Sequence, residues 1–436
     1  MRDTTKAVIA MDSFKGSLSS SEAGTAVMEG IKRVYPDAEV WVRPLADGGE
    51  GTVETLAAGM GGRLREVTVT GPLCRPVKCT YAILPSGTAV IEMAAAAGLP
   101  LVPFSERNPL YTTTRGVGEV ILDAVGAGCR KFLIGIGGSA TNDGGIGMLQ
   151  ALGFDCQDRA GRPVAPGALG LKELTVIRSE RVPSIIKECV FQIACDVDNP
   201  LCGERGCSAV FGPQKGADAR MIRQMDGWLA AYAAVAARSF TGSDGVPSGP
   251  VRRGTQREAA AAASHPVPET GETFPGSDGV PSGPVRRGTQ REAAAAADPD
   301  FPGSGAAGGM GFAFRVFLGA ELKPGIGLVA EHTRLEEYIR GADLVVTGEG
   351  RLDAQTVMGK APAGVAALAK KYGKPVIAFA GCLGEDASVC NAHGIDAYFP
   401  ILREAVTKEE AMDPHCAAKN LRDSAEQVFR AIRFCR

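Results

Sequence analysis

The chain lacks several features that would assign it to a large class of proteins. Its 47 Lys and Arg residues nearly balance 49 Asp and Glu residues, so the formal charge is −2 and there is no basic footprint for nucleic acid or an anionic membrane. No apolar run approaches the ~20 residues that cross a bilayer, and the N-terminal residues do not resemble a signal peptide. We therefore expect a cytoplasmic protein whose partners are small molecules, with neither nucleic acid nor a membrane among them.

Patterns typical of zinc sites and of covalent catalysis are also missing. The 12 cysteines form no CxxC pair and only 4 histidines accompany them, so the spacing of a zinc site is absent. Scattered cysteines fit a reduced compartment, which agrees with the cytoplasm. His265 lies in an insertion described below and the other histidines lie in polar contexts, so a Ser-His-Asp apparatus is not supported.

The sequence does contain enough apolar residues for two cores, with 45% hydrophobic content in 436 residues. Its start reads as a βαβ unit: a strand at 6–11, a helix that begins after an N-cap at 19–21, and a strand at 38–43. The same order returns near the C-terminus, where 342–350 and 374–381 read as strands and 361–373 as a helix. We expect an α/β fold in which both chain ends build one parallel sheet.

The middle of the chain has a different character. Residues 77–94 alternate around Pro85-Ser86-Gly87, which predicts a β-hairpin. We place a second α/β domain at 71–309, and the first domain at 1–70 and 310–436.

One segment is duplicated: GSDGVPSGPVRRGTQREAAAAA stands at 242–263 and again, 34 residues later, at 276–297. The unit is rich in Gly and Pro and poor in large apolar residues, which predicts a disordered surface insertion at about 241–303. We expect ordered chain to resume close to Gly305.

A glycine-rich segment, GIGGSATNDGGIGML at 135–149, follows an apolar strand and precedes a helical pattern. Glycines let backbone N–H groups approach phosphate oxygens, and the start of the helix adds partial positive charge. The polar residues offer groups to a nucleotide or to its magnesium ion, and are Ser139, Thr141, Asn142 and Asp143. Since the segment is neither a Walker A loop nor a GxGxxG fingerprint, a turn without a ligand stays open as an alternative.

Two further loops follow the first two strands and should meet at one edge of the sheet. The loop DSFKGS at 12–17 places Lys15 to neutralise a phosphate or carboxylate, and PLADGGEGT at 44–52 adds two acidic residues. Asp12, Asp47 and Glu50 could hold Mg²⁺ or accept a proton.

Two more segments carry candidate groups. CDVDNPLCG at 195–203 offers Asp196, which we favour over Asp198 because it lies nearer the strand end, and FGPQKGA at 211–217 adds Lys215. TGEGRLDAQTVMGKAPAG at 347–364 combines Glu349, Asp353 and Lys360. Groups of these kinds suit phosphoryl transfer, because its catalysis consists mainly of positioning the reactants and stabilising the charge on the phosphate oxygens.

Nine segments in order along the chain resemble the bacterial-type glycerate kinase family. They are VIAMDSFKGSLSS, PLADGGEGT, NPLYTTTRGVGE, GIGGSATNDGGIGMLQALG, CDVDNPLCG, FGPQKGA, GAAGGMG, ADLVVTGEGRLDAQTVMGKAP and NAHGIDAYF. The resemblance implies ATP-dependent phosphorylation of D-glycerate, with 2-phosphoglycerate the usual product. It also implies two α/β domains, one of them Rossmann-like, with the active site in the cleft between them. Two departures are Met11, where the family usually has proline, and the insertion before GAAGGMG.

On this hypothesis ATP and D-glycerate are the partners, Mg²⁺ is the cofactor, and the protein is a monomer or homodimer. Lys15 and Lys215 bind anionic groups, and Asp196 orients the glycerate hydroxyl. The full expected site has Asp196, Lys15 and Asp47 as catalytic residues, Asp143 and Asp47 as metal ligands, and around substrate and nucleotide Asp12, Ser13, Gly48, Gly49, Glu50, Gly137, Gly138, Ser139, Thr141, Asn142, Lys215, Glu349, Asp353 and Lys360.

Three alternatives stay open at this point. The product could be 3-phosphoglycerate, or the insertion could leave a catalytically silent metabolite-binding protein. A dinucleotide-dependent oxidoreductase would share the fold class, but no acidic residue follows a GxGxxG at the required distance.

Overall fold

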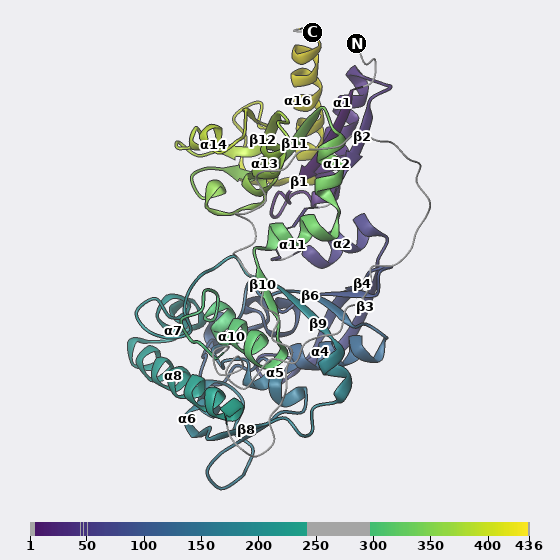
Figure 1. The fold of residues 1–436 in the computed structure, drawn as a ribbon. Helices are drawn as coiled ribbons and strands as arrows, with labels where there is room; N and C mark the ends of the chain where they lie inside the picture. Colours follow the sequence, from purple (N-terminus) through teal and green to yellow (C-terminus); the bar gives the residue numbers. More distant parts are fainter. Residues whose placement is uncertain (1–4, 44, 47, 50, 242–296, 435–436) are drawn as a thin grey trace, which may run out of the picture.

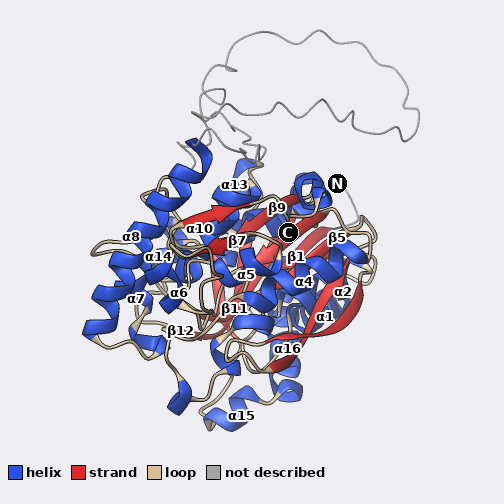
Figure 2. Ribbon diagram, turned by 90° about the horizontal axis from the view of Figure 1, so that it is seen from below, coloured by secondary structure: helices blue, strands red, loops and turns tan. Residues whose placement is uncertain are grey.

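The computed structural model describes residues 5–43, 45–46, 48–49, 51–241 and 297–434. These residues form two large β-sheets and one small one, with helices packed around them. Figure 1 shows the two large sheets in separate halves of the molecule, and Figure 2 shows the strands in red enclosed by helices in blue. The mixed α/β class predicted from the sequence is confirmed.

One large sheet has five strands, all parallel, in the order β13-β12-β11-β1-β2. Two strands come from the start of the chain and three from its end, which confirms the predicted parallel sheet built from both chain ends. The strands are β1 (Lys6–Met11), β2 (Glu39–Val42), β11 (Leu344–Leu352), β12 (Val376–Leu383) and β13 (Ala397–Pro400).

Alternate residues of β1 face two different layers of helices. Ala7, Ile9 and Met11 belong to the core that includes α1 and α16, whereas Val8 and Ala10 belong to the core that includes α12 and α13. Because helices cover both faces, the strand is apolar at every position after Lys6, as expected for a parallel sheet. The four helices are α1 (Ser20–Val34), α12 (Leu335–Gly341), α13 (Ala361–Lys371) and α16 (Pro414–Phe434).

Helix α1 begins at the predicted place. The Ser19 hydroxyl accepts the Glu22 N–H at 3.2 Å, and the Glu22 carboxylate accepts the Ser19 N–H at 2.8 Å, which forms a capping box.

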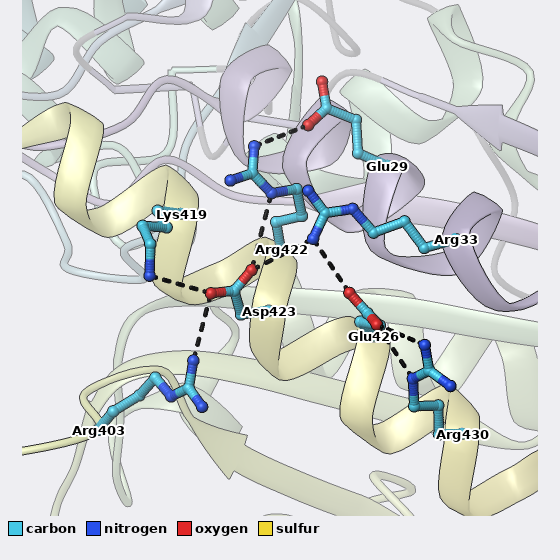
Figure 3. A network of polar contacts seen from close by, with 8 residues as sticks. All are labelled: Glu29, Arg33, Arg403, Lys419, Arg422, Asp423, Glu426 and Arg430. Atoms are coloured by element: carbon cyan, nitrogen blue, oxygen red, sulfur yellow. Dashed lines mark hydrogen bonds and ion pairs between the residues drawn. The ribbon is translucent and has the colours of Figure 1, made fainter.

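Ion pairs line the outer edge of the contact between α1 and α16 (Figure 3). Arg33 reaches Glu426 at 3.0 Å, and Arg422 reaches Glu29 at 3.2 Å. Such exposed pairs each contribute at most about 1 kcal/mol. The fully buried side chains of α16, such as Phe429, therefore supply more of the attachment than the charges do.

The other large sheet has six strands in the order β10-β9-β6-β5-β4-β3. The first four are parallel, β4 pairs antiparallel with both β5 and β3, and the hairpin predicted around Pro85-Ser86-Gly87 joins β4 to β5. The strands are β3 (Arg63–Thr70), β4 (Pro76–Ile83), β5 (Thr88–Glu92), β6 (Lys131–Gly135), β9 (Val190–Ala194) and β10 (Glu321–Lys323).

The two faces of this six-stranded sheet bear different helices. The larger core gathers α4 (Arg115–Gly126), α5 (Ile146–Ala151), α8 (Ala219–Thr241) and α10 (Ala306–Leu318). The opposite face is covered by α2 (Thr52–Met60) and α11 (Gly325–His332). Figure 1 shows α2 and α11 lying between the two large sheets.

The remaining described elements are short. They are α3 (Ala94–Ala97), α6 (Ala168–Glu173), α7 (Cys207–Phe211), α14 (Val389–Ala392), α15 (Lys408–Met412), the hairpin of β7 (Asp155–Gln157) and β8 (Val176–Arg178), and 3-10 turns at Leu99–Leu101, Phe104–Glu106, Ser184–Glu188, Pro213–Lys215 and Thr356–Met358. Among the described helices, none is both long and apolar enough to span a bilayer.

The strand pairing bears on the predicted domain boundaries. Strands β3 and β10 pair within the six-stranded sheet, although boundaries at residues 70 and 310 assign both to the first domain. The six-stranded sheet thus draws on more of the chain than 71–309. Strand β10 is hard to predict from the sequence, because it is only three residues long and pairs with a strand about 130 residues earlier.

The chain on the C-terminal side of the duplicated segment is well packed. Ala297 is buried, the Pro299 carbonyl accepts the Leu201 N–H at 2.8 Å, and the Arg315 guanidinium lies 3.7 Å from the centre of the Phe301 ring. Packed chain thus begins several residues before Gly305. The predicted disorder of 242–296 concerns residues outside those that the structure describes.

Candidate active site

The glycine-rich segment leaves β6 at Gly135 and enters α5 at Ile146, as the sequence predicted. Between these two elements only Gly137 and Gly138 are exposed to solvent. Gly138 has a φ of 71°, which favours glycine. From Ser139 onward every residue up to the helix is buried. The backbone at 137–138 is thus the part of this segment that a ligand can reach.

Lys215 supports this segment from within. Its ammonium group donates to the Ser139 hydroxyl at 2.8 Å and to the Thr141 carbonyl at 2.7 Å, and the side chain is only 2% exposed. Burial lowers the pKa of Lys215 to about 8, against smaller opposing effects of Cys207 and Asp143. The placement argues against the predicted contact with a bound anion, because the ammonium faces neutral oxygens of the protein.

We expect the stability of the protein to depend on pH through Lys215. Between about 8 and the ordinary pKa of 10.5 the unfolded chain keeps the Lys215 proton while the folded chain releases it. The unfolded state binds more protons in this window, so the free energy of unfolding should rise with pH. Urea unfolding at pH 7.5, 9 and 10.5 should show this rise in the wild type relative to Lys215→Met. The exposed Lys187→Met is the matched control, and an unchanged difference between wild type and Lys215→Met across the series would contradict the assignment.

Asp143 is fully buried and its carboxylate is occupied by protein donors. It accepts the Thr114 N–H and hydroxyl, both at 2.9 Å, and the Gly145 N–H at 3.1 Å. Burial raises the pKa of Asp143, and these hydrogen bonds oppose the rise. The predicted metal role does not fit this placement, because a magnesium ion carrying water and phosphate needs oxygens open to the site. Asp143 instead fixes the turn before α5 to the start of α4.

Thr141 and Asn142 are likewise enclosed. Both are 0% exposed, and the Asn142 amide donates to the Ser208 hydroxyl at 2.8 Å. Gly308, in the GAAGGMG segment, packs so closely here that a Cβ on it would lie 2.1 Å from the Thr141 carbonyl oxygen. The predicted nucleotide contacts of these two side chains do not fit, since the folded chain covers them.

The loop after β2 reaches across to the six-stranded sheet. A Cβ on Gly135 would lie 1.9 Å from the Gly48 carbonyl oxygen, and a Cβ on Gly48 would lie 2.4 Å from that of Ala194. Gly135 and Ala194 are register partners at the ends of β6 and β9. Small residues at both positions therefore let the Gly48–Gly49 backbone rest on the ends of these strands.

The same loop is tied to the end of β1. The Ser20 hydroxyl donates to the Met11 carbonyl at 2.7 Å and accepts the Leu45 N–H at 3.1 Å. The loop after β2 thereby links the carboxyl ends of the strands in both sheets. Asp47 and Glu50, predicted in this loop, lie outside the described residues.

Asp196 follows β9 and is exposed at the edge of the six-stranded sheet. One of its oxygens accepts the Gly325 N–H at 2.8 Å, at the start of α11. A Cβ on Gly48 would lie 3.7 Å from the Cα of Gly325, so Asp196 and the Gly48 loop meet at this point. Asp198, by contrast, is paired with Arg205 at 3.2 Å, which supports the choice of Asp196.

The loop after β1 brings three of the predicted residues together. Asp12 is buried and accepts the Ser13 N–H at 2.7 Å, while its own N–H donates to the Gly348 carbonyl at 2.8 Å. The Lys15 side chain is exposed. The backbone of Gly350 approaches Lys15, since a Cβ on Gly350 would lie 3.7 Å from the Lys15 nitrogen of the main chain. Lys15 is thus an exposed cation at the edge of the five-stranded sheet.

Glu349, near the end of β11, and the predicted groups that follow this strand also form one cluster. Glu349 is buried, accepts the Thr356 hydroxyl at 2.6 Å and lies 3.6 Å from the Lys360 ammonium. Burial raises the pKa of Glu349, and Thr356 and Lys360 oppose the rise. Asp353 pairs with Arg351 at 3.1 Å.

Among the described residues, no cluster of three or more His, Cys, Asp or Glu side chains could hold a metal. Magnesium bound with a nucleotide needs no such cluster, because it takes one or two carboxylates and completes its shell with phosphate oxygens and water. Of the two carboxylates predicted as magnesium ligands, Asp143 is enclosed by the protein and Asp47 lies outside the described residues.

Two contributors were missed by reasoning from the sequence. Glu92 ends β5 and binds the start of α2, and the Gly325 N–H binds Asp196. Glu92 carried a signal, since it is the one charged residue in the strand TAVIE. A backbone amide such as that of Gly325 carries none, because every non-proline residue has one.

The chain is similar to known proteins over nearly its whole length. A sequence model of the glycerate kinase family matches residues 7–263 and 285–433. Glycerate kinase of Haemophilus influenzae is 42% identical over 430 residues, which cover 98% of this chain and 99% of that protein. Glycerate 2-kinase of Escherichia coli is 44% identical over 407 residues, 93% of each chain. The crystal structure of a glycerate kinase 2 candidate from Salmonella typhimurium LT2 has 40% identity and a TM-score of 0.80, and covers 99% of this chain and 98% of that one.

Proposed function

Because the chain belongs to the glycerate kinase family, we propose that it transfers the γ-phosphoryl group of ATP to the 2-hydroxyl of D-glycerate. Its relatives support a kinase acting on glycerate, and the E. coli relative named a glycerate 2-kinase supports the position of transfer. The observation that carries the proposal is the meeting of Asp196, the Gly48–Gly49 backbone and exposed Gly137 at the carboxyl ends of β6 and β9.

Each of these groups suits one part of the reaction. The exposed backbone at Gly137 and Gly138 offers N–H groups to phosphate oxygens, and Lys15 offers a positive charge. Asp196 accepts a hydrogen bond from the glycerate hydroxyl, so that its oxygen points at the γ-phosphorus. As the new O–P bond forms and the bond to ADP breaks, the proton moves to Asp196. Magnesium, when bound with ATP, neutralises phosphate charge.

The activity is tested by coupling ADP release to NADH oxidation with ATP, Mg²⁺ and D-glycerate. We expect ADP release that requires D-glycerate and is much slower with L-glycerate. Absence of glycerate-dependent ADP release would overturn the proposal.

We expect the duplicated segment to be dispensable. Deleting residues 242–275 removes one 34-residue repeat and joins Thr241 to the second copy at 276–297. Since loop closure changes by only about 0.6 kcal/mol per doubling of length, folding should be nearly unaffected. The kcat and KM values should stay within about threefold of the full chain, measured in the same coupled assay, and the melting temperature should match. A gain of tenfold or more on deletion would show instead that the insertion suppresses activity.

A further inference from the structure

The chain passes between the two large sheets twice, and each passage runs through a helix on the same face of the six-stranded sheet. Helix α2 lies between β2 and β3, and α11 lies between β10 and β11. Both pack through apolar side chains on that face, as Leu56 and Leu328 show. The N-termini of these two helices therefore determine where the loop after β2 and the Asp196 edge meet.

Three register partners end neighbouring strands on this face. Glu92 of β5 stands opposite Gly135 of β6, and Gly135 stands opposite Ala194 of β9. Side chains alternate between the two faces along β5, and Val90, two residues before Glu92, belongs to the core formed with α2 and α11. Glu92 therefore lies on the same face of the sheet as these two helices. The Gly48 backbone covers Gly135 and Ala194, and Glu92 stands beside it as the only charged member of the row.

The Glu92 carboxylate binds the start of α2. It accepts the Val53 N–H at 2.8 Å, and the N–H groups of Gly51 and Thr52 also act on it as donors. The N-cap residue of this helix is Gly51, which has no side chain with which to cap it. Thr52 in turn holds the loop, since its hydroxyl donates to the Gly49 carbonyl at 2.8 Å.

We propose that Glu92 is a positioning residue of the kinase reaction: by holding the N-terminus of α2 against the end of β5, it fixes the backbone of Gly48 and Gly49 at the substrate site. It acts through this backbone and does not touch the substrate. The inference rests on the proposed function for the reaction that it serves, but the structural step stands on the contacts of Glu92 alone.

The charge of Glu92 gives a second readout. Burial raises its pKa to about 7, Glu54 of α2 adds to the rise, and the amides of Val53, Gly51 and Thr52 oppose it. Cys79 of β4 also lies within electrostatic reach. As the pH falls through about 7 the carboxylate takes up a proton and loses part of its attraction for the helix N-terminus. Glutamine keeps one acceptor oxygen but cannot titrate.

The test compares Glu92→Ala, Glu92→Gln and the wild type. We expect Glu92→Ala to lower kcat/KM for glycerate by about tenfold or more, and Glu92→Gln to lower it less. In the wild type kcat/KM should fall as the pH drops below 7, and in Glu92→Gln this fall should be absent. Glu410→Ala is the matched control, because the Glu410 carboxylate also accepts a backbone N–H at a helix start, that of Thr407 at 2.9 Å on α15.

Hydrogen exchange gives a readout that needs no activity. Peptides covering 48–56 should exchange faster in Glu92→Ala, while those covering 407–412 should not. Unchanged exchange at 48–56 would overturn the inference about Glu92, whether or not the wild type turns over glycerate. Absence of glycerate turnover in the wild type would overturn the proposed function separately. If exchange is faster but kcat/KM and the pH profile equal those of the wild type, Glu92 only caps the helix. That outcome would also overturn the inference. If Glu92→Ala does not fold, Glu92→Gln and its pH profile decide.

Discussion

Replacing Asp196 by Asn should lower kcat by roughly 10²–10⁴-fold, the range typical of a lost general base, with little change in the KM for glycerate. The substitution removes the charge that accepts the hydroxyl proton, yet keeps an oxygen that can accept the Gly325 N–H now bonded at 2.8 Å. The fold and the start of α11 should therefore survive. Steady-state kinetics with varied glycerate, together with a melting curve, measures both effects.

Asp198→Asn is the matched control for this experiment. Asp198 lies two residues further along, is exposed, and pairs with Arg205 at 3.2 Å, away from the Gly325 amide. Its replacement should leave kcat within about twofold, since exposed ion pairs contribute at most about 1 kcal/mol. Equal kinetic effects of the two substitutions, or an Asp196→Asn loss confined to KM, would contradict a role for Asp196 in the chemical step.

Gly135→Ala should also abolish most of the activity, although Gly135 offers no functional group. Its new Cβ would meet the Gly48 carbonyl oxygen at 1.9 Å, so the loop after β2 has to move outward. Overpacking of this kind costs about 1–3 kcal/mol of stability, and a displacement of about 1 Å at a site can cost on the order of 100-fold in rate. We expect a loss of that order in kcat/KM with a modest fall in melting temperature.

Gly126→Ala provides the comparison. A Cβ on Gly126, at the exposed end of α4, would meet nothing within 4 Å. Alanine favours a helix by up to about 1 kcal/mol over glycine, so this variant should be as active as the wild type and no less stable. Full activity of Gly135→Ala would show that the loop does not rest on β6 during catalysis.

The parts of the fold that the sequence predicted depend on local patterns. The apolar run at 6–11 reflects a strand buried on both faces, and Ser19 with Glu22 forms the capping box that starts α1. The Pro85-Ser86-Gly87 turn joins two antiparallel strands as predicted. In each case neighbouring residues determine the structure, so one sequence suffices.

The parts that the sequence did not predict depend on distant residues. Ser, Thr, Asn and Asp after a glycine pair look alike whether they face a ligand or the protein interior. Here Lys215, more than 70 residues away, and Gly308, more than 160 residues away, cover the segment at Thr141. The same holds for Glu92, whose role follows from its register beside Gly135 and not from its neighbours in sequence.

The most direct test of the account is the identity of the product. The protein should be incubated with ATP, Mg²⁺ and ¹³C-labelled D-glycerate, and the phosphorylated carbon identified by ¹³C and ³¹P NMR. We expect phosphorus coupling to the C2 proton and carbon, as in 2-phosphoglycerate. Coupling at C3, or glycerate recovered unchanged while the protein is folded, would contradict it.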